Sequence, residues 1–289
     1  GLDLVPYPQI FNDVNNQKAE VILYRPTGES GDFEKANFPI GVEGGKTSTC
    51  PTQNLMEAYD MKDGTPFVWN NQSNPYDNRD PRMKYTIVCN EMKWPVDPVE
   101  IWEGGTNGLP LQNATTTGYY LKKYVNNTIS FEAGSTVTKK QHNWVLFRYG
   151  EILLNYAEAM INAFHDPNYK DAVYNMSARE AVNQIRGRTN ISLPGFPSDI
   201  TEKDFVKRLK NERRVELAFE GHRFWDVRRW KELGQTANIY GVKITKNNEV
   251  ISYEKFLLET RAVTDNMYFY PIPNTERFKN PNLGQNPGW

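Results

Sequence analysis

The feature that most constrains the fold of this 289-residue chain is a change in sequence pattern near residue 143. Beyond this point, apolar residues recur at spacings of three and four, which is the period of a helix with one buried face. Before it, turn-forming pairs such as Gly104-Gly105 keep the apolar runs short. The sequence therefore predicts a loop-rich part, residues 1–142, followed by a helical part, residues 143–289.

The first predicted helix spans residues 144–164. Its apolar stripe comprises Leu146, Tyr149, Leu153, Tyr156, Ala157 and Met160. These residues lie three or four positions apart along the stripe and therefore share one face. Asp166-Pro167 predicts the end of this helix, because proline disfavours the helical conformation of the residue before it.

Two more helices are predicted after it. Ser177 and Glu180 have the spacing of a capping box, in which hydroxyl and carboxylate each satisfy an exposed backbone amide. Thr201 opens the third helix, which we expect to run to Gly221 and to continue through Trp230. Consecutive helices joined by short turns are typical of antiparallel stacks such as tetratricopeptide (TPR) repeats. The chain is therefore predicted to be mainly α, a TPR-like antiparallel helix scaffold with long ordered loops.

The final segment, residues 270–289, is rich in proline. Pro271 and Pro273 near its start and Pro287 near its end argue against both a helix and a central strand. The sequence predicts an extended tail that packs on the protein. The aromatic residues expected to pin it are Tyr268, Phe269 and Trp289.

Composition excludes several classes of function. Thirty-four basic and 35 acidic residues give a net charge of −1, which argues against nucleic acid as the main partner. No apolar run approaches the roughly 20 residues of a membrane-spanning helix. Cys50 and Cys89 could form one disulfide or remain two free thiols. Three histidines without HxH or HExxH spacing argue against a zinc site, and neither a metal site nor a cofactor is predicted.

A densely charged segment, residues 212–229, offers three interpretations. Glu212, Glu216 and Glu220 lie at i, i+4 and i+8 among several arginines, and paired carboxylates are what a glycosidase needs. A carboxylate beside a guanidinium has a lowered pKa and is a poor general acid. We therefore expect a structural ion-pair network that locks the third helix to its continuation, with catalysis or a partner-contacting surface as the alternatives. Trp225 and Trp230 are predicted to be core residues.

Aromatic residues make up 13% of the chain, yet its mean hydropathy is −0.69, so many aromatics lie in polar loops. Sugar rings stack on exposed aromatic faces while neighbouring amides bind their hydroxyls. The segment 69–76 matches this requirement best, followed by Trp94 and Trp102, which lie beside Pro95 and Gly104-Gly105. The loop 24–45, with Phe33 and Phe38, comes third. The predicted ligand-binding residues are Trp69, Asn70, Asn71, Tyr76, Trp94 and Trp102.

Five segments, in order along the chain, together resemble the SusD/RagB family. Residues 78–82 read NRDPR, which resembles the family's RDPR element, and residues 118–124 read GYYLKKY, which resembles its GYxxxKY element. Residues 147–159, FRYGEILLNYAEA, resemble the family helix RYAEILLNYAEA. Residues 211–230, NERRVELAFEGHRFWDVRRW, resemble its ERRxELAFEGxRxxDLRRW segment. Residues 270–289 resemble its YPIP…NPxLxQNPGW ending.

The resemblance implies a SusD-like fold and a non-catalytic function. Members of this family are surface lipoproteins of the Bacteroidetes outer membrane that capture nutrients, here expected to be oligosaccharides, for import through a SusC-like TonB-dependent transporter. The resemblance also implies that this chain is the C-terminal portion of a longer protein, whose contact with the membrane is a lipid anchor on the preceding portion. The alternatives are peptide capture, as in the RagB branch, a lid that mainly contacts the transporter, and a glycoside hydrolase.

Overall fold

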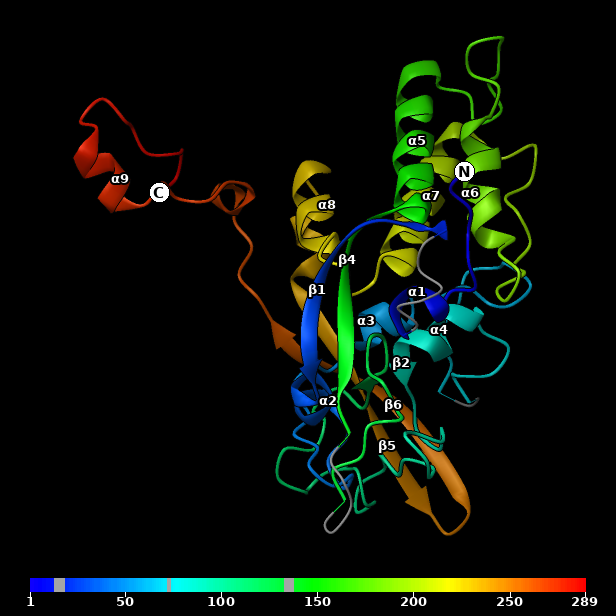
Figure 1. Cartoon of the computed structure of the whole chain (residues 1–289), viewed down its shortest axis with the longest axis vertical. Helices are drawn as coiled ribbons and strands as arrows, with labels where there is room; N and C mark the ends of the chain where they lie inside the picture. The colour runs from blue at the N-terminus through cyan, green and yellow to red at the C-terminus, as the bar shows by residue number, and fades with distance from the viewer. Residues whose placement is uncertain (13–18, 72–73, 133–137) are drawn as a thin grey trace.

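Three packed helices form one end of the molecule (Figure 1). The computed structural model describes residues 1–12, 19–71, 74–132 and 138–289. The helices are α5 (Tyr149–Phe164), α6 (Ala178–Arg186) and α7 (Glu202–Glu216). Their apolar faces meet in one core, here called the helical core. Its fully buried residues include Leu153, Leu154, Ala157, Ala181, Val182, Ile185, Phe205 and Leu209.

Two long antiparallel pairs of strands lie outside the helical core (Figure 1). The strand β1 (Val21–Ser30) pairs with β4 (Lys140–Arg148), and β4 leads directly into α5. The strands β5 (Asn238–Asn247) and β6 (Val250–Thr260) form a hairpin at the end of the molecule opposite the helices. No sequence pattern above predicted this hairpin.

The remaining elements are short. They are the helices α1 (Gln9–Asn12), α2 (Asp32–Asn37), α3 (Gln53–Met56), α4 (Pro81–Thr86), α8 (Arg223–Arg229) and α9 (Asn274–Lys279), the paired strands β2 (Ile87–Val88) and β3 (Tyr120–Leu121), and 3₁₀ turns at Leu233–Thr236 and Asp265–Tyr268. Long loops connect them within the described residues 38–71 and 74–132. The structure is 29% helical, so the prediction of a mainly α chain is not confirmed.

The predicted starts of two helices are confirmed in atomic detail. The Ser177 hydroxyl accepts from the Glu180 amide at 3.1 Å, and the Glu180 carboxylate accepts from the Ser177 amide at 2.9 Å, which is a complete capping box. The Thr201 hydroxyl caps α7 by accepting from the Asp204 amide at 3.1 Å. These signals are local, since each pair of groups lies within one turn.

The predicted boundary of the first helix is wrong at its N-terminal end. Residues 144–148 belong to β4, and α5 begins at Tyr149. Trp144 pairs with Arg25 of β1, and Leu146, predicted to lie on the buried stripe, is 48% exposed. Residues 144–147 are β-branched, aromatic or aliphatic, and pairing with β1 decides their conformation. The helix ends at Phe164 as predicted.

Three other predictions in the second half need correction. α7 ends at Glu216 rather than Gly221, because the chain turns through Phe219, whose φ is +61°. Trp225, predicted as core, is 59% exposed, while Trp230 is half-buried. The tail beyond residue 270 contains the short helix α9 and extends away from the body of the molecule (Figure 1). Phe269 and Trp289, which were predicted to pin the tail, are 65% and 49% exposed, and Trp289 donates its indole N–H to the backbone carbonyls of Asn266 and Phe269.

A second core lies under the loops and is here called the loop core. Its buried residues include Phe38, Tyr59, Met83, Trp94, Tyr119, Tyr120, Val242, Ile244 and Tyr253. It therefore combines residues from both sides of position 143, and the loop-rich and helical parts share one interior. At Gly118, whose φ is +82°, an added Cβ would lie 2.4 Å from the Val242 carbonyl oxygen, so only glycine lets this loop approach β5.

A buried ion-pair network joins the two parts. Its carboxylates are Glu20, Asp80, Glu212, Glu216 and Glu220, and its cations are Arg82, Lys123, Arg148, Arg186 and Arg188. Their side chains are at most 4% exposed. The network that the sequence predicted is present. The cations that surround its glutamates come from other segments rather than from residues 212–229. The predicted contact between α7 and α8 is made by Arg213 and Asp226, which form an ion pair at 2.8 Å.

Glu216 is the centre of this network. It accepts from Arg82 of α4 at 2.9 Å, from Arg148 at the end of β4 at 2.8 Å and from Arg188, which follows α6, at 2.8 Å. Burial alone would raise its pKa, but the three guanidinium groups hold that pKa well below its ordinary value. One carboxylate on α7 thus fixes the ends of three other segments.

Two further findings concern the cysteines and the lengths of the helices. Cys50 and Cys89 are separate thiols, the second of them buried, so the disulfide alternative is not realised in this structure. Among the described residues, no helix combines the length and the apolar character that crossing a bilayer requires.

We predict that Glu216→Gln lowers the free energy of unfolding at pH 7 by about 3–5 kcal/mol, because three buried arginines lose their shared counter-charge. Urea unfolding measures the change. The control is Glu276→Gln, whose partner Lys279 is 71% exposed, and we expect less than about 1 kcal/mol there. Equal losses in both variants would contradict a central role for Glu216.

The same network predicts a dependence on pH. The folded-state pKa of Glu216 lies below its unfolded value of about 4.3, so the stability that it contributes is present above that value and is lost as the pH falls below it. The free energy of unfolding should therefore begin to decline at about pH 4.3 and continue to decline below pH 3. Glu216→Gln should decline less steeply over the same range. Parallel curves for the two proteins would exclude Glu216 as a source of this dependence.

Candidate ligand-binding site

The loops of the first part enclose a hollow of about 680 Å³, here called the loop hollow. Its walls come from residues 38–43, 94–99, 106–107 and 127–132. The loop core lies directly beneath, because Phe38, Trp94 and Val99 belong both to that core and to the wall of the hollow. The hollow therefore has a rigid floor.

Asn107 holds two of the walls together. Its side chain accepts from the Glu100 amide at 2.8 Å and donates to the Ile40 carbonyl at 2.5 Å. Its backbone carbonyl accepts the Tyr120 hydroxyl from the strand β3. Gly41 completes this contact, since its φ is +89° and an added Cβ would lie 2.3 Å from the Thr106 carbonyl oxygen.

The wall formed by residues 127–132 is held in place by polar contacts. The Asn126 amide donates to the buried carboxylate of Glu34 at 3.0 Å, and the Asn127 side chain donates to the Pro95 carbonyl at 3.5 Å. The Phe131 ring packs edge-on against Phe38 with 6.0 Å between ring centroids. The half-buried Phe131 ring thus lies in the wall at a defined angle.

The chemistry of the lining suits a polyhydroxylated ligand. The polar lining residues are Glu43, Asp97, Thr106, Asn107, Asn127, Thr128, Ser130 and Glu132. Rings provide apolar faces, while amides, hydroxyls and carboxylates provide hydrogen-bond partners for hydroxyl groups. The described part of the lining carries three carboxylates and neither lysine nor arginine, so it favours neutral over acidic ligands.

A sequence model of the SusD family matches residues 10–289. The chain belongs to the SusD family. The curated "SusD-like protein P2" of Formosa agariphila is 29% identical over 163 residues, which cover 54% of this chain and 28% of that protein. "SusD-like protein P38" of the same organism is 30% identical over 150 residues, 50% of this chain and 24% of the relative.

Solved structures of SusD-like proteins share the fold. One from Bacteroides fragilis NCTC 9343 superimposes with a TM-score of 0.81 at 26% identity, covering 100% of this chain and 59% of the other. A SusD-like carbohydrate-binding protein of the same strain gives a TM-score of 0.77 at 24% identity, covering 96% and 57%. The chain thus spans less than two thirds of the length of these relatives.

Two of the residues that the sequence proposed as ligand-binding do not present an open face. Tyr76 is 5% exposed and packs edge-on against Tyr119 and Tyr253 in the loop core. Trp94 is also 5% exposed, and the Lys122 ammonium lies 5.0 Å from the centre of its ring. Tyr76 is therefore a core residue, whereas Trp94 contributes the edge of a buried ring to the loop hollow.

The segment with Trp69 lies apart from the lining of the loop hollow. Trp69 is half-buried against the loop core, its indole N–H donates to the Asn71 side chain, and its ring meets Phe67 edge-on at 6.4 Å. Asn70 and Asn71 are exposed. The neighbouring positions 72–73, which belong to the same predicted segment, lie outside the described residues. Trp69 therefore keeps part of its surface accessible to a ligand.

Trp102 lies outside the loop hollow, whereas part of the third predicted loop lines it. Trp102 is half-buried, and Lys246 of β5 lies 4.3 Å from its ring centre, so a cation occupies one face. Phe38 of the loop 24–45 is buried and lines the loop hollow, while Phe33 packs on Trp144 and His142. The structure thus brings the Trp94 segment and part of the third loop together, and it leaves Trp69 and Trp102 outside.

Sequence reasoning missed Asn107, Asn127 and Phe131. Asn107 precedes Gly108 in a turn and Asn127 lies in an Asn-Asn-Thr turn, so each could have been read as a turn residue. Their common location depends on contacts between loops that are distant in the sequence. No local spacing signals such contacts.

Proposed function

We propose that this chain belongs to a non-catalytic capture protein that binds oligosaccharide at the outer-membrane surface for import through a SusC-like TonB-dependent transporter. Membership of the SusD family supports this function, and one family member of known structure is described as carbohydrate-binding. The observation that carries the proposal is the loop hollow, which combines a rigid floor, aromatic edges and closely spaced amides and hydroxyls.

The burial of the carboxylates in residues 212–229 supports capture without catalysis. Glu212, Glu216 and Glu220 are sealed inside the protein, and arginine or lysine partners lower the pKa of each, against the effect of burial. A glycosidase needs one carboxyl group that stays protonated near its substrate. These three side chains meet neither condition.

We expect Asn127→Ala and Phe131→Ala each to weaken the binding of a neutral oligosaccharide about three- to tenfold, through loss of a hydrogen bond or of a ring contact. Calorimetry against a panel of neutral oligosaccharides, with the full-length protein, measures the change. The controls are Asn282→Ala and Phe278→Ala in the tail, both exposed positions, which should bind as the unaltered protein does. Equal binding by all four variants would show that the ligand does not bind in the loop hollow. A protein that binds proteolytic peptides but no oligosaccharide would contradict the proposal.

The role of Trp69 requires a separate test. We expect Trp69→Ala to weaken oligosaccharide binding by a similar factor, because Trp69 retains an accessible ring next to two exposed amides. Trp230→Ala is the matched control, since Trp230 is also half-buried and its indole N–H donates to a side chain, Glu158, at 2.7 Å. Unchanged affinity in Trp69→Ala, with circular dichroism showing an intact fold, would remove Trp69 from the ligand surface.

A further inference from the structure

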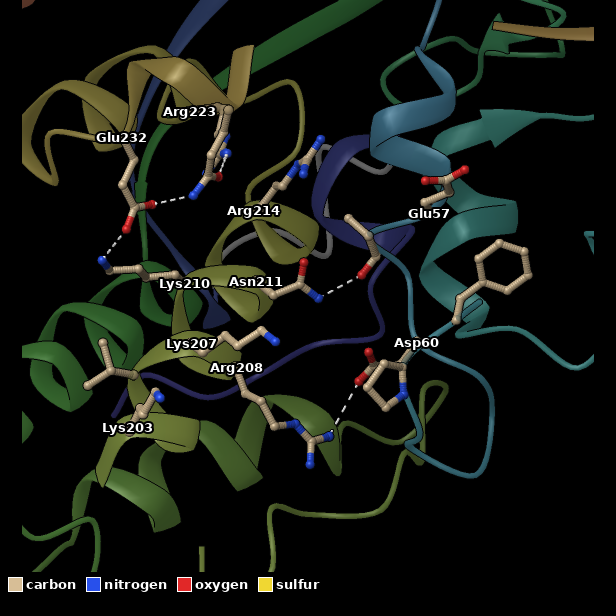
Figure 2. Close-up of a pocket in the computed structure, with 15 residues that line it drawn as sticks. Glu57, Asp60, Lys203, Lys207, Arg208, Lys210, Asn211, Arg214, Arg223 and Glu232 are labelled. Carbon is tan, nitrogen blue, oxygen red and sulfur yellow. Dashed lines mark hydrogen bonds and ion pairs between the residues drawn. The ribbon is translucent and has the colours of Figure 1, made fainter. Parts of the chain in front are cut away.

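A second hollow of about 460 Å³ lies between α7 and the segment 57–67 and is here called the cationic cleft (Figure 2). It shares no described lining residue with the loop hollow. Its charged lining residues are Glu57, Asp60, Lys203, Lys207, Arg208, Lys210, Arg214, Arg223 and Glu232. Six of these nine side chains are cationic, so the cleft has the opposite charge to the loop hollow.

The cations form a row along one side of α7 (Figure 2). Lys203, Lys207 and Arg214 lie at i, i+4 and i+11, spacings that keep side chains on one face of a helix. At about 1.5 Å per residue, the row extends for about 16 Å. A row of this length matches an extended ligand with several negative charges better than it matches one small anion.

The three carboxylates of the cleft are already engaged. Glu57 pairs with Lys255 of β6 at 2.8 Å, and Asp60 pairs with the buried Arg186 at 3.2 Å. Glu232 pairs with Lys210 at 2.5 Å. These acids therefore leave most of the positive charge in the cleft unneutralised.

Four cations have no carboxylate within ion-pair distance in the described part of the chain, namely Lys203, Lys207, Arg214 and Arg223. Arg223 donates to the neutral side chain of Gln235 at 2.8 Å. Arg214 donates to the backbone carbonyl of Asn54 at 2.8 Å. Burial, followed by the charge of Arg223, lowers the pKa of Arg214 to about 10. An anion between these two guanidinium groups would relieve their mutual repulsion.

The rim of the cleft carries the elements of a sugar site. Phe67 lines the cleft, with the buried Arg79 guanidinium 3.7 Å from the centre of its ring. It meets the half-buried Trp69 ring edge-on, and the exposed Asn70 and Asn71 follow Trp69 in the chain. Asn211 adds a side-chain amide within the cleft, where it donates to the Ala58 carbonyl at 2.7 Å. An aromatic and amide rim beside a row of cations fits a sugar chain with acidic substituents better than it fits an acidic peptide.

We propose that the cationic cleft is a second binding site, which takes oligosaccharides bearing carboxylate or sulfate groups. This inference rests on the glycan capture proposed above and adds a class of ligand to it. The two hollows then sort ligands by charge, the loop hollow taking neutral chains and the cationic cleft taking acidic ones.

The test compares calorimetric affinities of the full-length protein for a galacturonic acid hexamer, a heparin hexasaccharide and neutral maltohexaose, at low and at high salt. The variant is Lys203→Gln with Lys207→Gln, both exposed side chains without ion-pair partners among the described residues. The matched control is Lys84→Gln with Lys140→Gln, two exposed lysines outside the cleft. We expect the cleft variant to bind at least one of the acidic oligosaccharides about tenfold more weakly, with a smaller dependence on salt, and to bind neutral oligosaccharides unchanged.

The outcomes separate this inference from the proposed function. Neutral binding without acidic binding, or acidic binding that the cleft variant leaves unchanged, overturns the cationic cleft and leaves glycan capture standing. Binding of polyglutamate in place of acidic oligosaccharide overturns the assignment to sugars. Failure to bind any oligosaccharide overturns both proposals. A selective loss for the galacturonate hexamer or for the heparin fragment assigns the cleft to carboxylates or to sulfates.

Discussion

The buried charge of Glu216 is the interaction on which the rest of the structure depends. It neutralises arginines from α4, from the end of β4 and from the segment after α6, and those arginines in turn bind Asp80, Glu20, Glu212 and Glu220. Ion pairs of this kind cost much to desolvate, and removing one member leaves the others uncompensated. The network therefore specifies how the helical core and the loop core are joined more than it adds net stability.

This arrangement divides α7 into two functional sides. Glu212 and Glu216 face the interior, where they fix neighbouring segments, whereas Lys203, Lys207 and Arg214 line the cationic cleft. Because the inward side is anchored by several charge-assisted bonds, the cations on the other side are held in a fixed row. The same helix thus supports the fold and forms one wall of the proposed second site.

The sequence was a sufficient guide where the deciding contacts were local. The caps at Ser177 and Thr201 and the end of α5 near Pro167 depend on neighbours within a few residues, and all were predicted. The conformation of residues 144–148 depends on β1, more than a hundred positions away, and was predicted wrongly. The hairpin of β5 and β6 could have been found from the alternating Tyr240, Val242 and Ile244, each separated by one residue.

The candidate sites, too, could be predicted from the sequence only where local contacts decide. The sequence proposed aromatic and amide residues around Trp94 and Trp69 as ligand contacts, but exposure is a property of the packed structure, and Tyr76 is a core residue. The net charge of −1 says nothing about how charge is distributed over the two hollows. The acids of the loop hollow come together only where distant loops meet, whereas the cationic row on α7 follows from helical spacing and could have been found in the sequence. The two proposed sites would let one protein retain both neutral and acidic chains without a change in either site.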